Sequence, residues 1–221
     1  MYQHLWESGD AVALEVGKAV CVGRNYVAHA KELNNPIPDS PLLFIKPASA
    51  FCHFQSPLVL NTTLGEHHYE AELVLLVGET IDNHTREPLQ HICGIATGLD
   101  LTLRELQSKL KQQGHPWECA KAFDNSCSLT PFRAVNGLDE NNVLHYRFWQ
   151  NDALKQHGDS SLMIFSLSSL LTEISRYFTL NPGDIVMTGT PQGVGALNEG
   201  DTLALQLQDA PRYSATISVR R

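Results

Sequence analysis

The sequence predicts an α+β domain that is mainly β, with a few peripheral helices. Short runs of β-forming residues recur along the chain, separated by Gly, Pro, Asn or Asp, and they outnumber the helical patterns without alternating regularly with them. Neither a linker nor an internal repeat divides the 221 residues, which favours one large domain. Asn151 and Asp152 are typical of a tight hairpin turn between two such runs. Strands are predicted at residues 19–22, 42–45, 58–60, 69–78, 92–99, 143–150, 184–188, 202–207 and 213–219.

Two segments have the apolar spacing or the start signal of a helix. Residues 103–113 follow Thr102 and include Glu105, the pair that forms a capping box in which each side chain satisfies the other's backbone donor. Residues 167–178 carry an amphipathic stripe that Pro182 and Gly183 close. The stripe consists of Leu167, Leu170, Leu171, Ile174 and Phe178.

Composition excludes several classes of protein. The net charge is −8 and the few Lys and Arg residues are scattered, so a nucleic-acid partner is not expected. The first ten residues lack a signal-peptide pattern, and no apolar run approaches the ~20 residues that span a bilayer, so we expect a cytoplasmic protein without a membrane partner. The cysteines are odd in number and lack a C-x-x-C pair, which argues against a disulfide framework or a cysteine zinc site and favours small buried side chains. They are Cys21, Cys52, Cys93, Cys119 and Cys127.

The stretch YEAELVLLVG places Glu70 and Glu72 at the start of a run of branched apolar residues. On a strand the two carboxylates would lie ~7 Å apart on one face. A strand that is apolar on both faces is normally buried, where two like charges require a cation between them. The alternative is an edge strand on which both glutamates face water.

Asp100 ends the apolar run before the predicted helix, and it is a candidate third carboxylate beside Glu70 and Glu72. Such hard oxygen ligands favour Mg²⁺, Mn²⁺ or Ca²⁺ over zinc. An ordinary carboxylate at a helix start is the alternative for Asp100. The neighbouring His67 and His68 would point to opposite faces of a strand, so at most one could join the cluster, and we interpret both as structural or surface residues.

Three further features could support catalysis. His29 and Glu32 are spaced i, i+3, so on a helix the carboxylate could orient the imidazole as a water-activating base, although such pairs are usually surface pairs. Lys121 lies among small and apolar neighbours, where its ammonium could stabilise an oxyanion or extend to solvent. The turn TGTPQGVG lacks the ending of a phosphate-binding loop, and we expect it to bring backbone N–H groups and the Thr190 hydroxyl close to a carboxylate ligand.

Taken together, several ordered motifs resemble the fumarylacetoacetate hydrolase family in its short single-domain form. They are CVGRNYVAHAKE, LLFIKP, HYEAEL, GLDLTLRELQ, WECAKAFDNSC, SSLMIFS and GDIVMTGTPQGVG. The resemblance implies a mixed β-sandwich or roll with a few peripheral helices, and usually a homodimer. It places a short lead-in at residues 1–17 and one catalytic domain at residues 18–221.

The resemblance also assigns roles residue by residue. The metal ligands it implies are Glu70, Glu72 and Asp100. The catalytic residues it implies are the water-activating pair His29 and Glu32, and Lys121. The substrate-binding residues it implies are Gln107 and Thr190, with Arg24 and Lys46 as basic residues near the substrate.

The implied activity is a Mg²⁺- or Mn²⁺-dependent hydrolysis that cleaves a 2,4-dioxo acid, such as acetylpyruvate or fumarylpyruvate, to pyruvate and a carboxylic acid. The alternatives are decarboxylation or tautomerisation of oxaloacetate and isomerisation of 2-hydroxyhepta-2,4-diene-1,7-dioate, since all of these form the same enolate. The presence of His29 and Glu32 favours hydrolysis. A more remote alternative is a β protein that binds metal and carboxylate without catalysis. Residues 33–40 match no motif of the family and could form part of a substrate lid.

Overall fold

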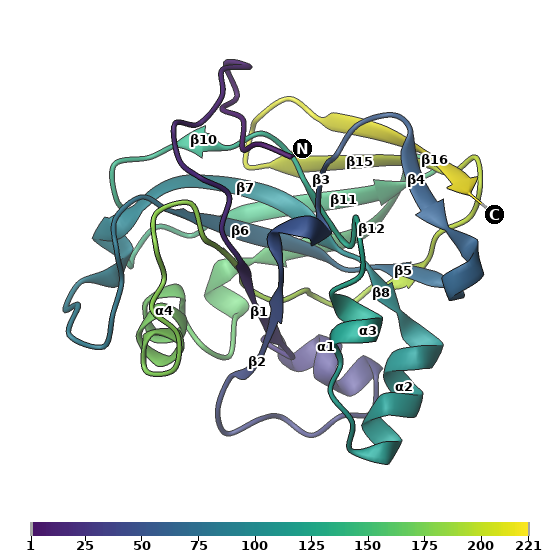
Figure 1. Ribbon diagram of the computed structural model, residues 1–221, viewed down its shortest axis with the longest axis horizontal. Helices are drawn as coiled ribbons and strands as arrows, with labels where there is room; N and C mark the ends of the chain where they lie inside the picture. The colour runs from purple at the N-terminus through teal and green to yellow at the C-terminus, as the bar shows by residue number, and fades with distance from the viewer. Residues whose placement is uncertain (1, 221) are drawn as a thin grey trace.

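The computed structural model describes residues 2–220 and contains three β-sheets (Figure 1). The large sheet has the order β2 (Leu42–Lys46), β1 (Ala19–Gly23), β13 (Ile185–Met187), β6 (Ala71–Val77), β7 (Ile92–Asp100), β9 (Cys127–Leu129) and β3 (Phe51–His53), with β10 (Arg133–Ala134) also paired to β7. The second sheet has the order β12 (Ala153–Asp159), β11 (His145–Gln150), β15 (Thr202–Leu207), β16 (Tyr213–Arg220) and β4 (Leu58–Asn61). The smallest has β14 (Gly195–Ala196), β5 (His67–Tyr69) and β8 (Thr102–Leu103).

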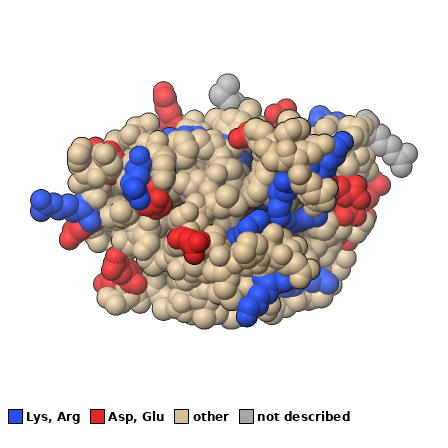
Figure 2. Space-filling model, turned by 90° about the horizontal axis from the view of Figure 1, so that it is seen from below, with Lys and Arg blue, Asp and Glu red and all other residues tan. Residues whose placement is uncertain are grey.

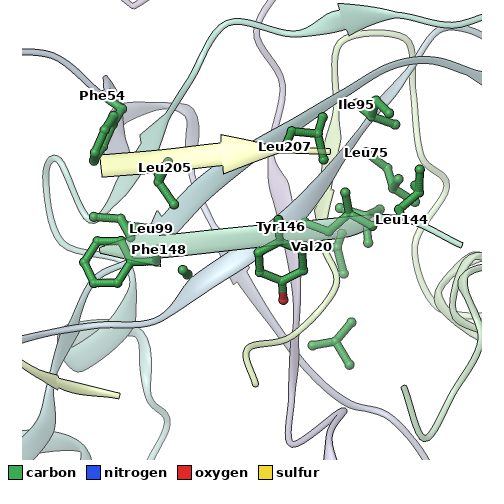
Figure 3. Packing of buried hydrophobic residues seen from close by; sticks show 14 of the residues in the cluster. Val20, Phe54, Leu75, Ile95, Leu99, Leu144, Tyr146, Phe148, Leu205 and Leu207 are labelled. Carbon is green, nitrogen blue, oxygen red and sulfur yellow. The ribbon is translucent and has the colours of Figure 1, made fainter. Parts of the chain in front are cut away.

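The main core lies between the large sheet and the second sheet. Val20, Leu75 and Leu99 of the large sheet share this core with Tyr146 and Phe148 of β11 (Figure 3). Alternate residues of each strand point into it, as expected for sheets that pack face to face.

The central strand β6 is buried on both of its faces. Val74 and Leu76 point away from the main core into a second apolar cluster that includes Val12 and Phe132. The N-terminal segment and the turn before β10 therefore cover the outer face of the large sheet. This double burial explains why the sequence of β6 is apolar at every position after Glu72.

The helices lie at the periphery. α1 (Val27–Glu32), α2 (Arg104–Gln113) and α3 (Glu118–Lys121) gather along one edge of the sheets, and α4 (Leu167–Ser175) lies apart from them (Figure 1). Short 3₁₀ turns occur at Ala48–Ala50, Thr62–Leu64, Pro88–His91 and Ser160–Leu162. The predicted class, mainly β with peripheral helices, is confirmed.

Most predicted elements are confirmed, but two details are wrong. The predicted strand 69–78 is broken at Glu70, where the chain leaves β5 in the smallest sheet and enters β6 in the large sheet. The predicted capping box is also absent, because α2 starts at Arg104 and no side chain caps it. Thr102 instead lies in β8, and its hydroxyl donates to the Asp100 carbonyl and accepts from Lys121.

Two local predictions have clear outcomes. Asn151 and Asp152 have φ values of 51° and 60°, so they form the predicted hairpin turn of mirror-image type between β11 and β12. All five cysteines are free. Cys21 and Cys127 are buried as expected, whereas Cys52 and Cys93 are half-buried and Cys119, on the short helix α3, is exposed. No helix among residues 2–220 has the length and apolar character needed to span a membrane.

We expect Gly158→Ala to destabilise the fold. A Cβ atom at Gly158 would lie 2.1 Å from the Tyr146 ring, which is fully buried and cannot move aside. Overpacking of this kind costs about 1–3 kcal/mol. Urea unfolding measures the loss, and Leu154→Ala, on the same strand at a half-exposed position, should change the free energy of unfolding by less than about 1 kcal/mol. Equal effects of the two substitutions would contradict this account of the packing.

Candidate active site

Three buried carboxylates meet where β6 and β7 pair. Glu70 precedes β6, Glu72 is its second residue, and Asp100 ends β7. The Asp100 N–H donates to the Glu70 carbonyl at 2.8 Å, which sets these two residues opposite each other. One carboxylate oxygen from each residue lies within 4.8 Å of the other two, and all three side chains are buried. Because β6 lies between β13 and β7, the alternative of a water-facing edge strand is excluded.

Lys121 neutralises two of these carboxylates directly. Its Nζ atom lies 2.9 Å from Glu70 Oε2, 2.7 Å from Asp100 Oδ2 and 2.6 Å from Thr102 Oγ1. The short helix α3 positions the side chain, which is buried and passes beside the Phe44 ring. Lys121 therefore extends to the carboxylates and not to solvent.

Arg104 is a site residue that the sequence reasoning did not identify. It donates a hydrogen bond to Glu70 Oε1 and a second one, of 2.8 Å, to Gln107 Oε1. Arg104 and Gln107 have the i, i+3 spacing of neighbours on the first turns of α2. This i, i+3 spacing is the signal in the sequence that marks Arg104 as a neighbour of Gln107.

Lys46 lies behind the carboxylates and does not line the cavity described below. Its Nζ atom is fully buried, lies 2.8 Å from Asp100 Oδ1, and donates to the Lys121 carbonyl and to Ser126 Oγ. Asp100 Oδ1 has no hydrogen-bond partner, so charge attraction and not a directed hydrogen bond joins it to Lys46. This position supports a role in holding Asp100 and Lys121, in contrast to the substrate contact that the resemblance implied for Lys46.

The glycine-rich turn after β13 supplies a backbone donor to the cluster. The Gly189 N–H donates to Glu72 Oε2 at 2.8 Å. Gly189 has φ +98°, and a Cβ atom there would lie 2.7 Å from Asn25 Cβ, so both the conformation and the space require glycine. The expected backbone contact is present, whereas the Thr190 hydroxyl donates to the Ala71 carbonyl and not to a carboxylate.

His29 and Glu32 lie on α1 as the spacing predicts. His29 Nδ1 is 3.3 Å from Glu32 Oε2, and the Gly193 N–H donates to Glu32 Oε1 at 3.0 Å. A carboxylate can only accept a hydrogen bond, so Nδ1 carries the proton and the lone pair is on Nε2. The pair is more than a surface contact, because the imidazole is buried and lines the cavity.

A cavity of about 110 Å³ opens in front of the carboxylates. Figure 2 views the molecule from the side on which α1–α3 lie; the larger group of Lys and Arg side chains lies on the right half of this face, and others lie towards its left edge. Leu33 and Asn35 contribute to the cavity wall, so the unmatched segment 33–40 does border the site.

Of the predicted site residues, the lining includes Arg24, His29, Glu70, Glu72, Gln107, Lys121 and Thr190. Lining residues that sequence reasoning missed are Phe44, Arg104, Lys111 and Trp117.

Other predicted residues lie outside this lining. Glu32, Lys46 and Asp100 support the wall from behind. His67 contacts the Gly65 carbonyl and His68 contacts Glu66, so neither histidine joins the carboxylates, as interpreted from the sequence.

The environment separates the pKa values of the two glutamates. Burial, followed by the charges of Asp100 and Glu70, raises the pKa of Glu72 well above its usual value. Burial acts in the same direction on Glu70, but Lys121 and Arg104 outweigh it and lower the pKa of this carboxyl. Burial alone would lower the pKa of Lys121, yet Asp100 and Glu70 raise it, so its ammonium stays charged.

The three carboxylates fit a hard divalent cation. Their ligand oxygens converge, and Asp100 Oδ1 is buried without a hydrogen-bond partner. Among residues 2–220, Glu72 has no ion pair with a lysine or arginine, and its surroundings disfavour the ionised carboxylate. A divalent cation would give Asp100 Oδ1 a partner and would stabilise the ionised Glu72 carboxylate. An all-oxygen ligand set suits Mg²⁺, Mn²⁺ or Ca²⁺.

Comparison with known proteins agrees with this geometry. The family described as fumarylacetoacetate (FAA) hydrolase C-terminal matches residues 18–218. The chain belongs to this family.

Relatives within the family are enzymes with related activities. Oxaloacetate tautomerase YcgM of Escherichia coli (strain K12) is 43% identical over 209 residues, which cover 93% of this chain and 94% of that protein. A putative fumarylacetoacetate isomerase/hydrolase from Oleispira antarctica superposes with a TM-score of 0.94 at 41% identity, covering 99% of this chain and 100% of that one. Fumarylpyruvate hydrolase from Pseudomonas aeruginosa, solved with Mn²⁺ and pyruvate, has a TM-score of 0.89 at 32% identity, covering 98% and 95%. This chain is thus an enzyme of the family.

We expect the affinity for Mn²⁺ to rise with pH. In the metal-free protein the pKa of Glu72 is raised, so below that pKa the cation must displace a proton before it can bind the carboxylate. The dissociation constant should therefore increase by about tenfold for each pH unit of acidification in this range. Titration calorimetry in buffers of different ionisation enthalpy counts the released proton. Metal binding without proton release would contradict the assignment of Glu72.

Substitution Asp100→Asn should remove most of the stabilisation that Mn²⁺ confers. A ligand at about 100 times its dissociation constant stabilises a folded protein by about 2.7 kcal/mol. The quantity to compare is the metal-induced increment in thermal stability, because the substitution also disturbs Lys46 and Lys121 without metal. The matched control is Glu66→Gln, a surface carboxylate that contacts His68. An undiminished increment in Asp100→Asn would contradict the ligand assignment.

Proposed function

We propose that the protein is a divalent-metal-dependent tautomerase that interconverts the enol and keto forms of oxaloacetate. The observation that carries this proposal is the 43% identity to oxaloacetate tautomerase YcgM over nearly the whole of both chains. The size of the cavity also supports it. At about 110 Å³ the cavity is small beside the ~300–1,000 Å³ of pockets for drug-sized ligands, which favours a four-carbon acid over a longer one.

The proposed metal ligands are Glu70, Glu72 and Asp100, and Mg²⁺ or Mn²⁺ is the proposed ion. The bound cation would supply Lewis acidity that favours the enolate. Gly189 holds Glu72 through its N–H, and Lys46 and Lys121 hold Asp100 by charge. These contacts fix the carboxylates in place.

His29 is the proposed acid–base residue. Tautomerisation moves one proton between carbon 3 and the enol oxygen, so it needs a group that can both accept and donate a proton. With Nδ1 hydrogen-bonded to Glu32, the Nε2 lone pair can take the proton from carbon 3 of the keto form and give it to the enolate oxygen, which completes the enol; the reverse transfer returns the keto form. Glu32 stabilises the imidazolium that forms, and the Gly193 N–H holds Glu32 in place.

Lys121 supplies a fixed positive charge at the cavity. Its ammonium lines the cavity and is held by Glu70, Asp100 and Thr102. A fixed charge in a buried site stabilises negative charge that develops on an enolate oxygen. Because Glu70 and Asp100 raise the pKa of Lys121, the ammonium acts by its charge and does not give up its proton.

Hydrolysis of a 2,4-dioxo acid is the second candidate. The geometry of His29 and Glu32 also suits a base that activates water, and the fumarylpyruvate hydrolase from Pseudomonas aeruginosa has the same fold. Decarboxylation of oxaloacetate gives the enolate of pyruvate, as hydrolysis does, whereas tautomerisation passes through the enolate of oxaloacetate. The same bound cation would stabilise either enolate, so the site alone does not separate these reactions, whereas their products do.

Two assays on the Mn²⁺-loaded protein separate the candidates. The first follows the decay of enol-oxaloacetate by its ultraviolet absorbance, and the second follows pyruvate release from acetylpyruvate, fumarylpyruvate and oxaloacetate. We expect fast enol decay with little pyruvate. Rapid release of pyruvate from a dioxo acid, with enol decay no faster than in buffer, would replace the proposal by hydrolysis.

In the same assays, His29→Gln should lower the rate of enol decay by about 10²–10⁴-fold, the usual contribution of a positioned acid–base group. Mn²⁺ binding should be retained, because His29 contacts none of the three carboxylates through a hydrogen bond. His68→Gln is the matched control, since that imidazole contacts Glu66 outside the cavity. Full activity in His29→Gln would exclude this residue as the acid–base group.

A further inference from the structure

Two basic side chains at the cavity have no carboxylate partner within residues 2–220. Arg24 and Lys111 both line the cavity, and neither forms an ion pair among the described residues. The other cavity cations are neutralised, since Arg104 contacts Glu70 and Lys121 contacts Glu70 and Asp100. In a chain of net charge −8, this local excess of positive charge is unusual and calls for an anion.

Separate elements bring these two cations to the same cavity. Arg24 directly follows β1 and has φ +61°, a left-handed conformation that is uncommon outside glycine. Lys111 belongs to the last turn of α2, and its Nζ atom donates to Asn35 Oδ1 at 3.0 Å. Lys111 is exposed and Arg24 is half-buried, whereas the carboxylates are buried, so the cations lie at the outer end of the cavity.

The cations also affect each other. Burial lowers the pKa of Lys111, and the neighbouring charges of Arg24 and then Arg104 lower it further. Like charges that are held close together without a counter-ion favour binding of an anion between them. A carboxylate there would accept charge-assisted hydrogen bonds from both side chains.

We propose that Arg24 and Lys111 form a subsite for the second carboxylate of the substrate, so that the enzyme selects a four-carbon 2-oxo dicarboxylate over the corresponding monocarboxylate. The inference rests on the proposed function, because it requires the first carboxylate to lie at the metal ligands. Lys111 is then a specificity-determining residue, and Arg24 shares the contact.

A purely structural role for Lys111 makes a different prediction. Its hydrogen bond to Asn35 joins α2 to the loop after α1, and this tether alone could explain the position of the lysine. Under that account, loss of either partner has the same effect on every ligand. Under the subsite account, only loss of the positive charge changes the preference between a dicarboxylate and a monocarboxylate.

Malate and 2-hydroxybutyrate are suitable probes. Both carry the same carboxylate and 2-hydroxyl group, and they differ only in a carboxylate or a methyl group at the far end. Titration calorimetry on the Mn²⁺-loaded protein gives the ratio of their dissociation constants. This readout does not depend on turnover.

We expect wild-type protein to prefer malate, and Lys111→Gln to reduce that preference by about five- to tenfold, as for loss of one partly exposed charge-assisted contact. Lys111→Arg should restore it, and Arg24→Gln should reduce it as Lys111→Gln does. Lys109→Gln makes the same charge change on α2 away from this cavity and should leave the ratio unchanged.

An unchanged ratio in Lys111→Gln, or an equal loss in Lys111→Arg, would overturn the subsite. The outcome is independent of the reaction that is catalysed. If enol decay is not accelerated but the ratio still falls in Lys111→Gln, the proposed function fails and the subsite stands. If enol decay is accelerated and the ratio does not change, the reverse holds.

Discussion

The structure depends on the burial of three carboxylates between two central strands. Glu70, Glu72 and Asp100 are withdrawn from water, which costs several kcal/mol per ion unless each charge is compensated. Three basic side chains surround them: Lys46 from β2, Arg104 from α2 and Lys121 from α3. Two of the peripheral helices, α2 and α3, are therefore tied to the sheet by charge.

This arrangement leaves one carboxylate undercompensated. Within the described part of the chain, Glu70 has two cationic partners and Asp100 has two, whereas Glu72 has a backbone N–H and no cationic partner. A cation that binds near Glu72 would gain most from the ionised carboxylate, and it would do so at the floor of the cavity. The three carboxylates thus differ in how far their charges are compensated, and this difference links the electrostatics of the core to the chemistry we propose.

Rigid and adaptable parts meet at this site. The carboxylates, Lys46 and Lys121 are buried and belong to paired strands or to the short helix that packs on them. Arg24, Lys111 and Asn35 belong to a loop, a helix end and an irregular segment at the cavity mouth. The rigid part holds the groups for the chemistry that relatives share. The cavity mouth is the place where residues select one acid over another, because a change of side chain there disturbs few other contacts.

The sequence by itself determined the elements and many of the chemical groups of this protein. Strand periodicity identified β6 and β7, the i, i+3 spacing identified His29 and Glu32, and the motif series pointed to the family. These signals are local, since each depends on residues a few positions apart. The same local reasoning failed at Thr102, where a capping box was expected, because a contact with the distant Lys121 uses its hydroxyl.

Only the tertiary structure decided which charges face one another. Arg104 with Glu70, and Lys46 with Asp100, are pairs separated by 34 and 54 residues, and no sequence spacing reports such a contact. It also decided that Lys46 lies behind the site while Lys111 borders the cavity. Burial sets the energy of a charge, and burial depends on how strands far apart in the chain pair and pack.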